Sequence, residues 1–289
     1  MFIKGKIGFI GQGWIGKNYA DDFEERGYKV VRYDIEKFKD NLEELKTCPV
    51  VFVAVPTPST SKGFDDNILI DAIKNATIDG QVVIIKSTIK LGTTDKIQVM
   101  FPERYLIHSP EFLTEKTARY DVAKPPRNIL GYTTKSQPVC GRIMNILPIA
   151  SYETIVPCRE AEFVKYMGNI WFYFKVMAIN TFYDIASKNK LDYSILKEML
   201  HADPRVGRTH SDPVHQGGRG AGGHCFIKDM SAFREMYENL VFGNEETSQE
   251  EREQLFAGLE MLKSLENYNK TLLKKSAKNL DLLKGVYGE

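Results

Sequence analysis

The chain lacks the features of a secreted or membrane-spanning protein. Its purely apolar stretches are short, as at residues 50–55, whereas a membrane span needs roughly 18 to 20 apolar residues. The apolar part of the opening segment is interrupted at once by glycines and has no small-residue cleavage site of a signal peptide. We therefore expect a cytoplasmic protein without a membrane segment.

An excess of charge of one sign is also missing. Lys and Arg together number 39 and Asp and Glu together 38, so the net charge is +1. Such a balance provides no global electric field that would collect nucleic acid or an anionic membrane surface. We expect no nucleic-acid partner.

Cysteine is scarce and scattered. Cys48, Cys140, Cys158 and Cys225 are far apart, and no Cys-x-x-Cys pair or Cys/His cluster has the spacing of zinc ligands. The sequence therefore predicts neither a disulfide framework nor a metal site. It fits a reducing compartment.

Alternating strand and helix patterns fill the first half of the 289 residues. The length suits about two domains of roughly 150 residues each. Near-continuous apolar runs between helical patterns are typical of a parallel sheet with helices on both faces. They predict an α/β protein with a doubly wound Rossmann domain over residues 1–156, followed by an all-helical domain over residues 157–289. The expected strands cover residues 6–11, 29–34, 50–55, 81–88, 105–111 and 128–132.

A glycine fingerprint follows the first expected strand. In GFIGQGWIG, Gly11 permits a tight turn, Gly13 lets the backbone approach a pyrophosphate, and Gly16 lets the next helix pack closely. Asp34 ends the second strand and can accept a hydrogen bond from a ribose 2′-hydroxyl, but it would repel a 2′-phosphate. The pattern predicts NAD as the cofactor, with a simple structural turn as the alternative. The expected contacts are Gly11, Gly13, Trp14, Ile15, Gly16 and Asp34.

The second half has the pattern of helices. Residues from about 160 to 188 contain no proline and one glycine, and apolar residues recur there at helical spacing, which predicts one long helix. Its aromatic run at residues 171–174 exceeds what a single stripe can bury. This favours a homodimer through the helix, with packing inside the chain as the alternative.

A glycine-rich segment leads into Cys225. Five of the seven residues from Gly217 to Gly223 are glycine, so a ligand could contact the backbone there, and Gly222 and Gly223 are the expected substrate contacts. If a helix begins near Cys225, the helix dipole and the ammonium of Lys228, one turn on, both favour the thiolate. This pattern indicates an activated nucleophile, with an inert buried cysteine as the alternative.

Several segments, in order, resemble those of the UDP-glucose/GDP-mannose dehydrogenases. They are GFIGQGWIG, VAVPTP, KSTIKLGTT with SPEFLTE, AEFVKYMGN and GAGGHCFIKD. The spaced set covers the chain from Lys6 to about Asp229, and DPRVG at residues 203–207 is also similar. The resemblance implies a dinucleotide domain, a long central helix that makes a dimer, and a third domain that binds the nucleotide sugar.

The resemblance also implies a reaction. Members of the family oxidise the primary alcohol of a sugar nucleotide to the carboxylic acid, using two NAD per turnover through a cysteine-bound intermediate. A thiol that traps the intermediate aldehyde as a thiohemiacetal makes the second hydride available and yields a thioester. Cys225 is then the expected nucleophile, and a nucleotide sugar of the UDP-glucose type is the expected substrate.

Other side chains complete the expected site. Lys165 and Asn169 lie one turn apart on the long helix and could hold a developing oxyanion, with a surface pair as the alternative. Glu111 ends a strand, where its carboxylate could act as general base in thioester hydrolysis. The resemblance makes Thr88 and Asp229 groups that position water or relay protons. It also implies cofactor contacts at Thr57, Thr88, Glu115 and Lys228, and a substrate contact at Lys165.

Alternatives remain open at this level. For Glu115 the alternative is a solvated helix charge. Only helical segments follow Asp229, so we expect the third domain to be missing, which leaves the base and hexose of the substrate undetermined. The alternatives to a nucleotide-sugar dehydrogenase are a two-electron hydroxyacid or polyol dehydrogenase, which would have no use for Cys225, and a non-catalytic NAD-binding dimer.

Overall fold

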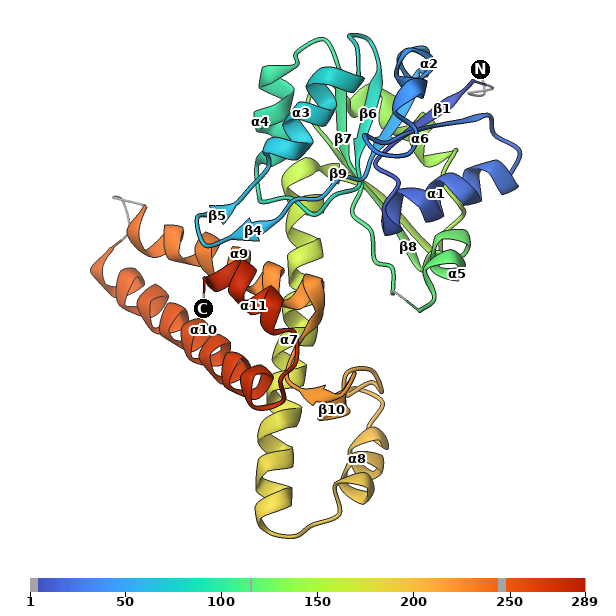
Figure 1. Ribbon diagram of the computed structural model, residues 1–289. Helices are drawn as coiled ribbons and strands as arrows, with labels where there is room; N and C mark the ends of the chain where they lie inside the picture. The colour runs from blue at the N-terminus through green and yellow to red at the C-terminus, as the bar shows by residue number, and fades with distance from the viewer. Residues whose placement is uncertain (1–4, 115, 244–247, 289) are drawn as a thin grey trace. The chain divides into compact units, whose positions relative to one another are not determined.

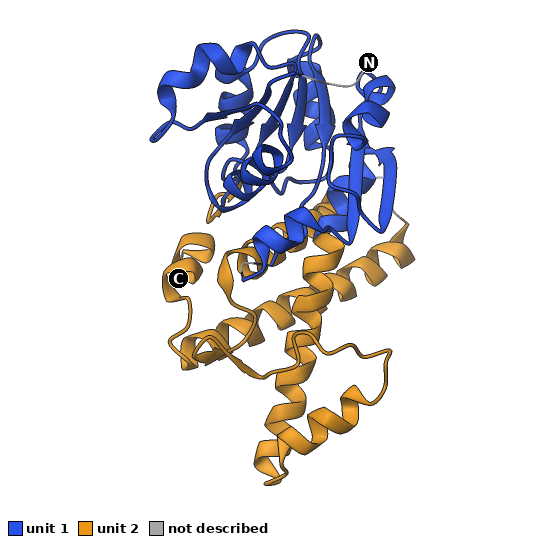
Figure 2. Cartoon of the chain, turned by 90° about the vertical axis from the view of Figure 1, so that its right-hand side faces the viewer, with its two compact units in different colours: residues 1–58, 65–165 blue, residues 59–64, 166–289 orange. Residues whose placement is uncertain are grey.

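The chain forms two compact units (Figure 2). The computed structural model describes residues 5–114, 116–243 and 248–288. Unit 1 comprises residues 1–58 and 65–165, and unit 2 comprises residues 59–64 and 166–289. The boundary expected between residues 156 and 157 thus falls shortly before this division, and the early segment 59–64 belongs to the second unit.

Unit 1 is built on a seven-stranded sheet in the order β2-β1-β3-β6-β7-β8-β9. Its strand pairs are parallel except for β7 with β8, which is antiparallel. The mostly parallel sheet, with β1 between β2 and β3, is that of a doubly wound fold and confirms the predicted fold class. The strands are β1 (Ile7–Ile10), β2 (Val30–Tyr33), β3 (Val50–Val53), β6 (Val82–Ile85), β7 (Tyr105–His108), β8 (Arg127–Tyr132) and β9 (Tyr152–Pro157).

Strand β9 and the direction of β8 were not expected from the sequence. Strand β9 lies at the edge of the sheet, all its residues are exposed or half-buried, and its sequence YETIVP has no long apolar run. The hydrophobic pattern of a strand is the same in either direction, because side chains alternate in both cases. The antiparallel pairing of β7 and β8 is therefore a property of the connection between them.

Helices cover both faces of this sheet (Figure 1). Phe9 of β1 and Phe52 of β3 stack with their ring centroids 4.9 Å apart and pack against Phe23 of α1. Gly8 of β1 faces the opposite side and lies against Leu45 of α2. The helices are α1 (Trp14–Glu25), α2 (Leu42–Lys46), α3 (Asn67–Ala76), α4 (Thr93–Met100), α5 (Ala118–Ala123) and α6 (Cys140–Met144), with short 3₁₀ turns η1 (Lys39–Asn41) and η2 (Gln137–Val139).

Unit 2 is mainly helical. Its core joins Ile170, Tyr173 and Met177 of α7 to Met230 of α9 and Leu262 of α10. No helix in the described ranges is both long enough and apolar enough to span a bilayer. The helices are α7 (Cys158–Lys188), α8 (Tyr193–His201), α9 (Gly223–Phe242), α10 (Gln249–Lys275) and α11 (Leu280–Tyr287), and two hairpins pair β4 (Ser59–Thr60) with β5 (Gly63–Phe64) and β10 (Val214–His215) with β11 (Gly218–Arg219).

The first turns of α7 belong to the packing of unit 1. Ala161 lies close against Gly131 of β8, where a side chain on the glycine would collide with it. The buried Glu162 carboxylate accepts hydrogen bonds from the backbone N–H of Thr94, at 2.7 Å, and from its hydroxyl, at 2.6 Å, in the first turn of α4. Burial raises the pKa of Glu162 against the opposing effect of these hydrogen bonds. These contacts explain why unit 1 extends past residue 156 into the helix.

Candidate functional site

The glycine turn after β1 forms the first part of the candidate site in unit 1. Gly11 has a φ of 84°, and a side chain there would collide with the carbonyl of Ala54. A side chain on Gly16 would collide with the carbonyl of Gly11, whereas one on Gly13 would meet nothing within 4 Å. Gly11 thus allows the turn to pack against the end of β3, and Gly16 allows α1 to pack against the turn. Gly13 leaves the loop open, so a ligand's phosphates could approach the backbone there.

The helix after this turn leaves its amino-terminal N–H groups available to an anion. Helix α1 begins at Trp14, and Gly13 in the N-cap position has no side chain that could accept from them. These N–H groups and the helix dipole favour a phosphate. Trp14 is exposed, whereas Ile15 packs against the core of unit 1.

Asp34 lies just beyond the end of β2 and is held in place by the backbone. Its Oδ2 accepts from the N–H of Gln12 at 2.8 Å, and its Oδ1 accepts from the N–H of Glu36 at 3.0 Å. Partial burial opposes ionisation, but the backbone N–H groups outweigh it and lower the pKa of Asp34. The residue therefore presents an oriented carboxylate beside the glycine turn.

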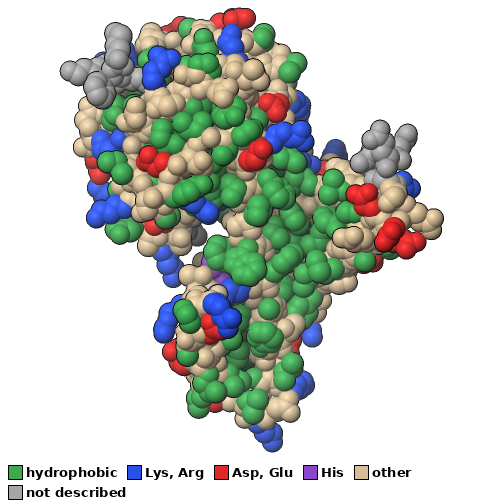
Figure 3. Space-filling model, turned by 180° about the vertical axis from the view of Figure 1, so that it is seen from behind, with side chains coloured by type: hydrophobic (Ala, Val, Ile, Leu, Met, Phe, Trp, Pro, Cys, Tyr) green, Lys and Arg blue, Asp and Glu red, His purple; other side chains and the backbone are tan. Residues whose placement is uncertain are grey.

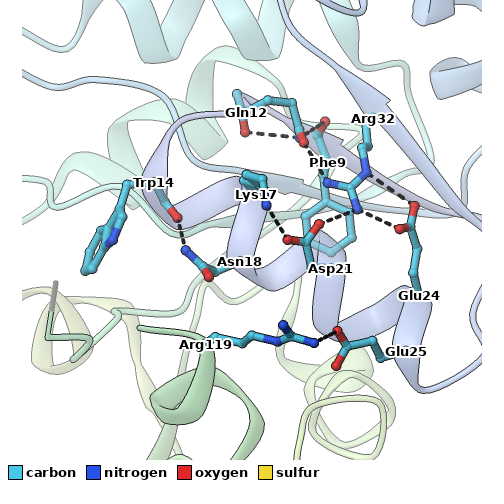
Figure 4. A network of polar contacts seen from close by, with 11 residues as sticks. Phe9, Gln12, Trp14, Lys17, Asn18, Asp21, Glu24, Glu25, Arg32 and Arg119 are labelled. Atoms are coloured by element: carbon cyan, nitrogen blue, oxygen red, sulfur yellow. Dashed lines mark hydrogen bonds and ion pairs between the residues drawn. The ribbon is translucent and has the colours of Figure 1, made fainter. Parts of the chain in front are cut away.

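Arg32, two residues before Asp34, is engaged by carboxylates of α1 (Figure 4). Its Nη2 lies 2.7 Å from both Asp21 Oδ1 and Glu24 Oε2, and its Nη1 donates to Gln12 Oε1 at 3.3 Å. An arginine near this strand end can accommodate a 2′-phosphate. Here two carboxylates engage the guanidinium, so Arg32 is not free to take that part.

The loops after β3 and β6 are joined by two of the expected residues. Thr57 is buried, and its hydroxyl donates to the carbonyl of Thr88 at 2.6 Å. Ser87, next to Thr88, donates in the same way to the carbonyl of Val55 at 2.7 Å. The expected cofactor contact Glu115 lies outside the described residues.

A buried ion pair joins Glu111 and Lys165. The Lys165 Nζ lies 2.9 Å from Glu111 Oε1 and donates to the Glu111 carbonyl at 2.8 Å. The N–H of Leu113 donates to Glu111 Oε2 at 2.8 Å. These contacts fix the orientation of the expected general base, and its partner is the lysine expected to hold an oxyanion.

A second buried lysine, Lys86, was not assigned a role from the sequence. Its Nζ lies 3.1 Å from Ser109 Oγ and 4.2 Å from the centre of the Tyr19 ring. Burial lowers the pKa of Lys86 to about 7, opposed by Glu111 and assisted by Lys165. The signal was a lysine directly after the apolar run VVII, since lysine is almost never fully buried unless it is paired.

His108 at the end of β7 is also buried. Neither of its ring nitrogens has a hydrogen-bond partner among the described residues. Burial, assisted by the charges of Lys86 and Lys165, lowers the pKa of His108 to about 3. The imidazole is therefore neutral at physiological pH.

Unit 2 brings three of the expected residues together. Asn169 Nδ2 donates to Asp229 Oδ2 at 2.5 Å, and Lys228 Nζ lies 2.9 Å from Asp229 Oδ1. Asp229 is almost fully buried, so its carboxylate orients the amide of Asn169 and the ammonium of Lys228. Asn169 follows Lys165 by one turn of α7.

Cys225 is the exposed cysteine of the four, and Cys48, Cys140 and Cys158 are buried. Burial raises the pKa of Cys48 and of Cys140 to about 11, as suits inert core thiols. Helix α9 begins at Gly223, two residues before Cys225, with Gly222 in the N-cap position. In the parts of the chain that the structure describes, no three His, Cys, Asp or Glu residues gather as a metal site would require.

These features define a class of protein: a dinucleotide-binding α/β unit joined to a helical unit that exposes one cysteine at a helix start. The comparisons with known proteins agree with this class. The NAD-binding domain model of the UDP-glucose/GDP-mannose dehydrogenase family matches residues 37–147, and its central-domain model matches residues 159–250. The chain belongs to the UDP-glucose/GDP-mannose dehydrogenase family, which confirms the resemblance seen in the sequence and the NAD cofactor.

Individual relatives give the extent of the similarity. A putative UDP-glucose 6-dehydrogenase, YtcA of Bacillus subtilis, is 29% identical over 208 residues, which are 68% of this chain and 47% of the relative. The chain thus spans about half the length of this relative.

Two solved structures share the fold. The UDP-glucose dehydrogenase of Pyrobaculum islandicum has a TM-score of 0.75 at 23% identity, over 91% of this chain and 68% of that one. The 3-hydroxyisobutyrate dehydrogenase of Mycobacterium tuberculosis has a TM-score of 0.72 at 15% identity, over 98% and 97% of the two chains. At these identities the likeness concerns the fold alone.

The oriented charge of Asp34 predicts the choice between nicotinamide cofactors. We expect NADH to bind at least ~10-fold more tightly than NADPH, a difference of ~1.4 kcal/mol, because a 2′-phosphate would meet this carboxylate. Asp34→Asn keeps one acceptor oxygen and removes the charge, so it should narrow the ratio. Fluorescence titration with both reduced cofactors measures it.

Asp79→Asn is the matched control for this titration, because Asp79 is an exposed aspartate of unit 1 outside the glycine turn. It should leave the ratio unchanged. Equal affinities for the two cofactors in the unmodified protein would contradict the prediction, as would an unchanged ratio in Asp34→Asn.

The buried Lys86 predicts a pH dependence of stability. Its pKa is about 7 in the folded chain against 10.5 as the ordinary value. Below pH ~7 both states carry the proton and the full cost of the buried charge applies, whereas this cost disappears as pH rises toward ~10.5. The free energy of unfolding, relative to Lys86→Met, should therefore increase over this window by up to a few kcal/mol.

Urea denaturation of both proteins at several pH values measures this difference. The exposed Lys74 of α3 provides the control, since Lys74→Met should show no such pH-dependent difference from the unmodified protein. A constant difference between the unmodified protein and Lys86→Met across the window would show that Lys86 titrates normally.

Proposed function

We propose that the protein oxidises the primary alcohol of a nucleotide sugar of the UDP-glucose type to the carboxylic acid, with NAD as the oxidant. The observation that carries the proposal is the exposed Cys225 in the first turn of α9, directly after a glycine loop, in a chain of this family. The name of the YtcA relative, a putative UDP-glucose 6-dehydrogenase, supports the same substrate class.

The chemistry explains why a cysteine is needed. Conversion of an alcohol to an acid removes two hydrides, and bound NAD supplies the hydride acceptor at each oxidation. After the first hydride leaves, Cys225 Sγ adds to the aldehyde carbon, and the resulting thiohemiacetal has a hydrogen on that carbon for the second transfer. The product is a thioester. Water then adds to its carbonyl carbon, the C–S bond breaks, and the acid and the free thiol result.

The remaining residues have roles that follow from their contacts. Asp229 orients the amide of Asn169, which together with Lys165 would stabilise the oxyanion that develops at the reacting carbon. The carboxylate of Glu111 would accept the proton of the attacking water in thioester hydrolysis. Thr88 and Asp229 would position water or relay its proton.

The cofactor and substrate contacts complete the proposal. Gly11, Gly13, Trp14, Ile15 and Gly16 would surround the pyrophosphate, and Asp34 the adenosine ribose. Thr57, Thr88, Lys228 and Glu115 are the further cofactor contacts that we propose. The backbone of Gly222 and Gly223, together with Lys165, would contact the sugar.

A two-electron hydroxyacid dehydrogenase is the second candidate function. The fold is compatible with it, because the 3-hydroxyisobutyrate dehydrogenase of Mycobacterium tuberculosis shares the fold over nearly the full length of both chains. Such an enzyme removes one hydride and needs no thiol nucleophile. An exposed cysteine at the start of a helix favours the four-electron reaction.

Replacement of Cys225 tests the reaction directly. The unmodified protein should release two NADH per sugar when it is screened with UDP-glucose, UDP-N-acetyl sugars and GDP-mannose, with the acid identified by mass. In Cys225→Ala, acid formation should fall on the order of 10³-fold or more, while NADH binding stays within twofold because the glycine turn does not involve the thiol.

Cys140→Ala serves as the matched control, because it removes a thiol that is buried in the core of unit 1. The Cys140→Ala variant should still release two NADH per sugar. Two NADH per sugar at the unmodified rate from Cys225→Ala would exclude the thioester. One NADH per substrate from the unmodified protein would favour the two-electron enzyme, and none with any substrate would favour the non-catalytic dimer.

We also propose a homodimer through α7. The proposal is supported by an exposed apolar stripe along this helix. Spacings of four, eleven and three residues separate its members, which are Met167, Trp171, Phe182 and Ile185. Figure 3 shows hydrophobic side chains gathered over this helix. A hollow of ≈ 220 Å³ lies beside the stripe and could receive a side chain of a second copy. It is lined by Phe182, Tyr193, Leu196, Lys197 and Leu200.

Charges placed on this stripe should separate the copies. The double substitution Trp171→Asp with Ile185→Asp should weaken association by ~100-fold or more, since buried aromatic anchors dominate interface energies. Size-exclusion chromatography with light scattering measures the mass. Val99→Asp is the control, because Val99 is exposed on α4 of unit 1 and is not part of the stripe, which belongs to unit 2. A monomeric unmodified protein, or a variant with unchanged mass, would contradict the dimer.

A further inference from the structure

The glycine loop before Cys225 is bound by side chains from the end of the chain. They belong to Asn269, Ser276, Lys278 and Asn279, which we call the C-terminal clasp. Asn269 lies within α10, Ser276 is the C-cap residue of that helix, and Lys278 and Asn279 follow it, with Asn279 as the N-cap residue of α11. Loop and clasp are both parts of unit 2.

The first half of the clasp pairs with the backbone of the loop. Asn269 is almost fully buried, and its amide makes two bonds to Ala221: Oδ1 accepts from the N–H at 2.7 Å, and Nδ2 donates to the carbonyl at 3.0 Å. Ser276 Oγ accepts from the N–H of Arg219 at 3.0 Å. A side-chain amide thus takes the place that a neighbouring strand would have.

Lys278 is an unusual part of the clasp because it is a buried cation. Its Nζ donates to the carbonyls of Gly218, at 3.3 Å, and Gly220, at 3.1 Å. Among the described residues no carboxylate forms an ion pair with it, and burial lowers its pKa. An ammonium that is buried against carbonyl groups alone costs stability. We infer that the conformation of the loop depends on the contacts of this ammonium with the two carbonyls.

Asn279 connects the clasp to the helix that carries the cysteine. It adopts a left-handed backbone conformation with a φ of 55°, and its Oδ1 accepts from the N–H of Gly223 at 2.9 Å. Gly223 is the first residue of α9, two residues before Cys225. A side chain on Gly222 would collide with the Asn279 amide, so loop and clasp are in direct contact.

Glycines allow the loop to adopt this shape but do not maintain it. Gly217, Gly220 and Gly223 have positive φ values, and glycine loses the most conformational freedom when a chain is ordered. The hydrogen bonds of the clasp supply the missing restraint. All four clasp residues lie beyond residue 250, where the match to the central-domain model ends.

We propose that the C-terminal clasp positions Cys225 by holding the glycine loop and the first turn of α9 in one conformation. The inference rests on the proposed function, in which Cys225 is the nucleophile. Asn279 is a positioning residue in this scheme, since it acts through Gly223 and the helix start rather than on substrate. With the first turn ordered, its N–H groups and the helix dipole favour the thiolate.

The test is Asn279→Gly, which keeps the left-handed backbone and removes the acceptor. The rate at which iodoacetamide alkylates Cys225 is measured against pH in the 289-residue chain, and mass spectrometry identifies the alkylated residue. We expect the profile to move about one pH unit higher, with an alkylation rate ~10-fold lower at pH 7, because a frayed first turn favours the thiolate less. With a nucleotide sugar, kcat should fall while KM changes little.

Ala277→Gly is the matched control. Ala277 also has a left-handed φ, of 51°, and lies two residues away, but its side chain has no hydrogen-bonding group to offer the loop. Its alkylation profile should stay within twofold of the unmodified protein's. If neither variant moves the profile, even where Tm falls, the clasp is only a structural support. If both move it equally, chain flexibility rather than the Asn279 bond is the cause.

Alkylation needs no substrate, so this experiment separates the two proposals. A profile that responds to Asn279→Gly in a protein that produces no NADH from any nucleotide sugar would retain the clasp and reject the proposed function. Two NADH per sugar together with an alkylation profile that does not respond to Asn279→Gly would support the proposed function and reject the clasp.

Discussion

The buried ion pair of Lys165 and Glu111 is the interaction on which the arrangement of unit 1 around its candidate site depends. It links the third turn of α7 to the loop after β7, so a residue far along the chain holds a strand end. Removing one partner of a buried pair typically costs ~3–5 kcal/mol, because the other charge is left uncompensated. Glu162, one turn earlier on the same helix, adds a second anchor through Thr94.

In unit 2, as in unit 1, buried polar side chains hold segments of the chain in place. Asp229 holds Asn169 of α7 and Lys228, and Asn269 holds the backbone of Ala221. The contacts of Asp229 with Asn169 and of Asn269 with Ala221 each join a helix to a segment that is distant in sequence. Such groups are costly unless every partner is in place. The conformation of the cysteine loop is therefore tied to the complete packing of the unit.

Local patterns carried the predictions that the structure and the comparisons confirm. The period of the apolar residues indicated the doubly wound sheet, and the long helix was expected within two residues of its observed start at Cys158. The glycine spacing predicted a tight turn between the first strand and the next helix, because the roles of Gly11 and Gly16 follow from steric limits on neighbouring backbone. The spaced motifs identified the family. The assignment of individual site residues remains a prediction.

What the sequence determined by itself is what depends on neighbours along the chain: strand and helix periods, the glycine turn, and a cysteine at a helix start. Tertiary structure alone decided the antiparallel direction of β8, the edge strand β9, the inclusion of residues 59–64 in unit 2, and the partners of Lys86 and Lys278. The residue type alone does not show whether a lysine is buried or exposed. Its role is set by which distant carbonyls, hydroxyls or carboxylates the fold brings within ~3 Å of its ammonium, and that distance is a property of the packed chain.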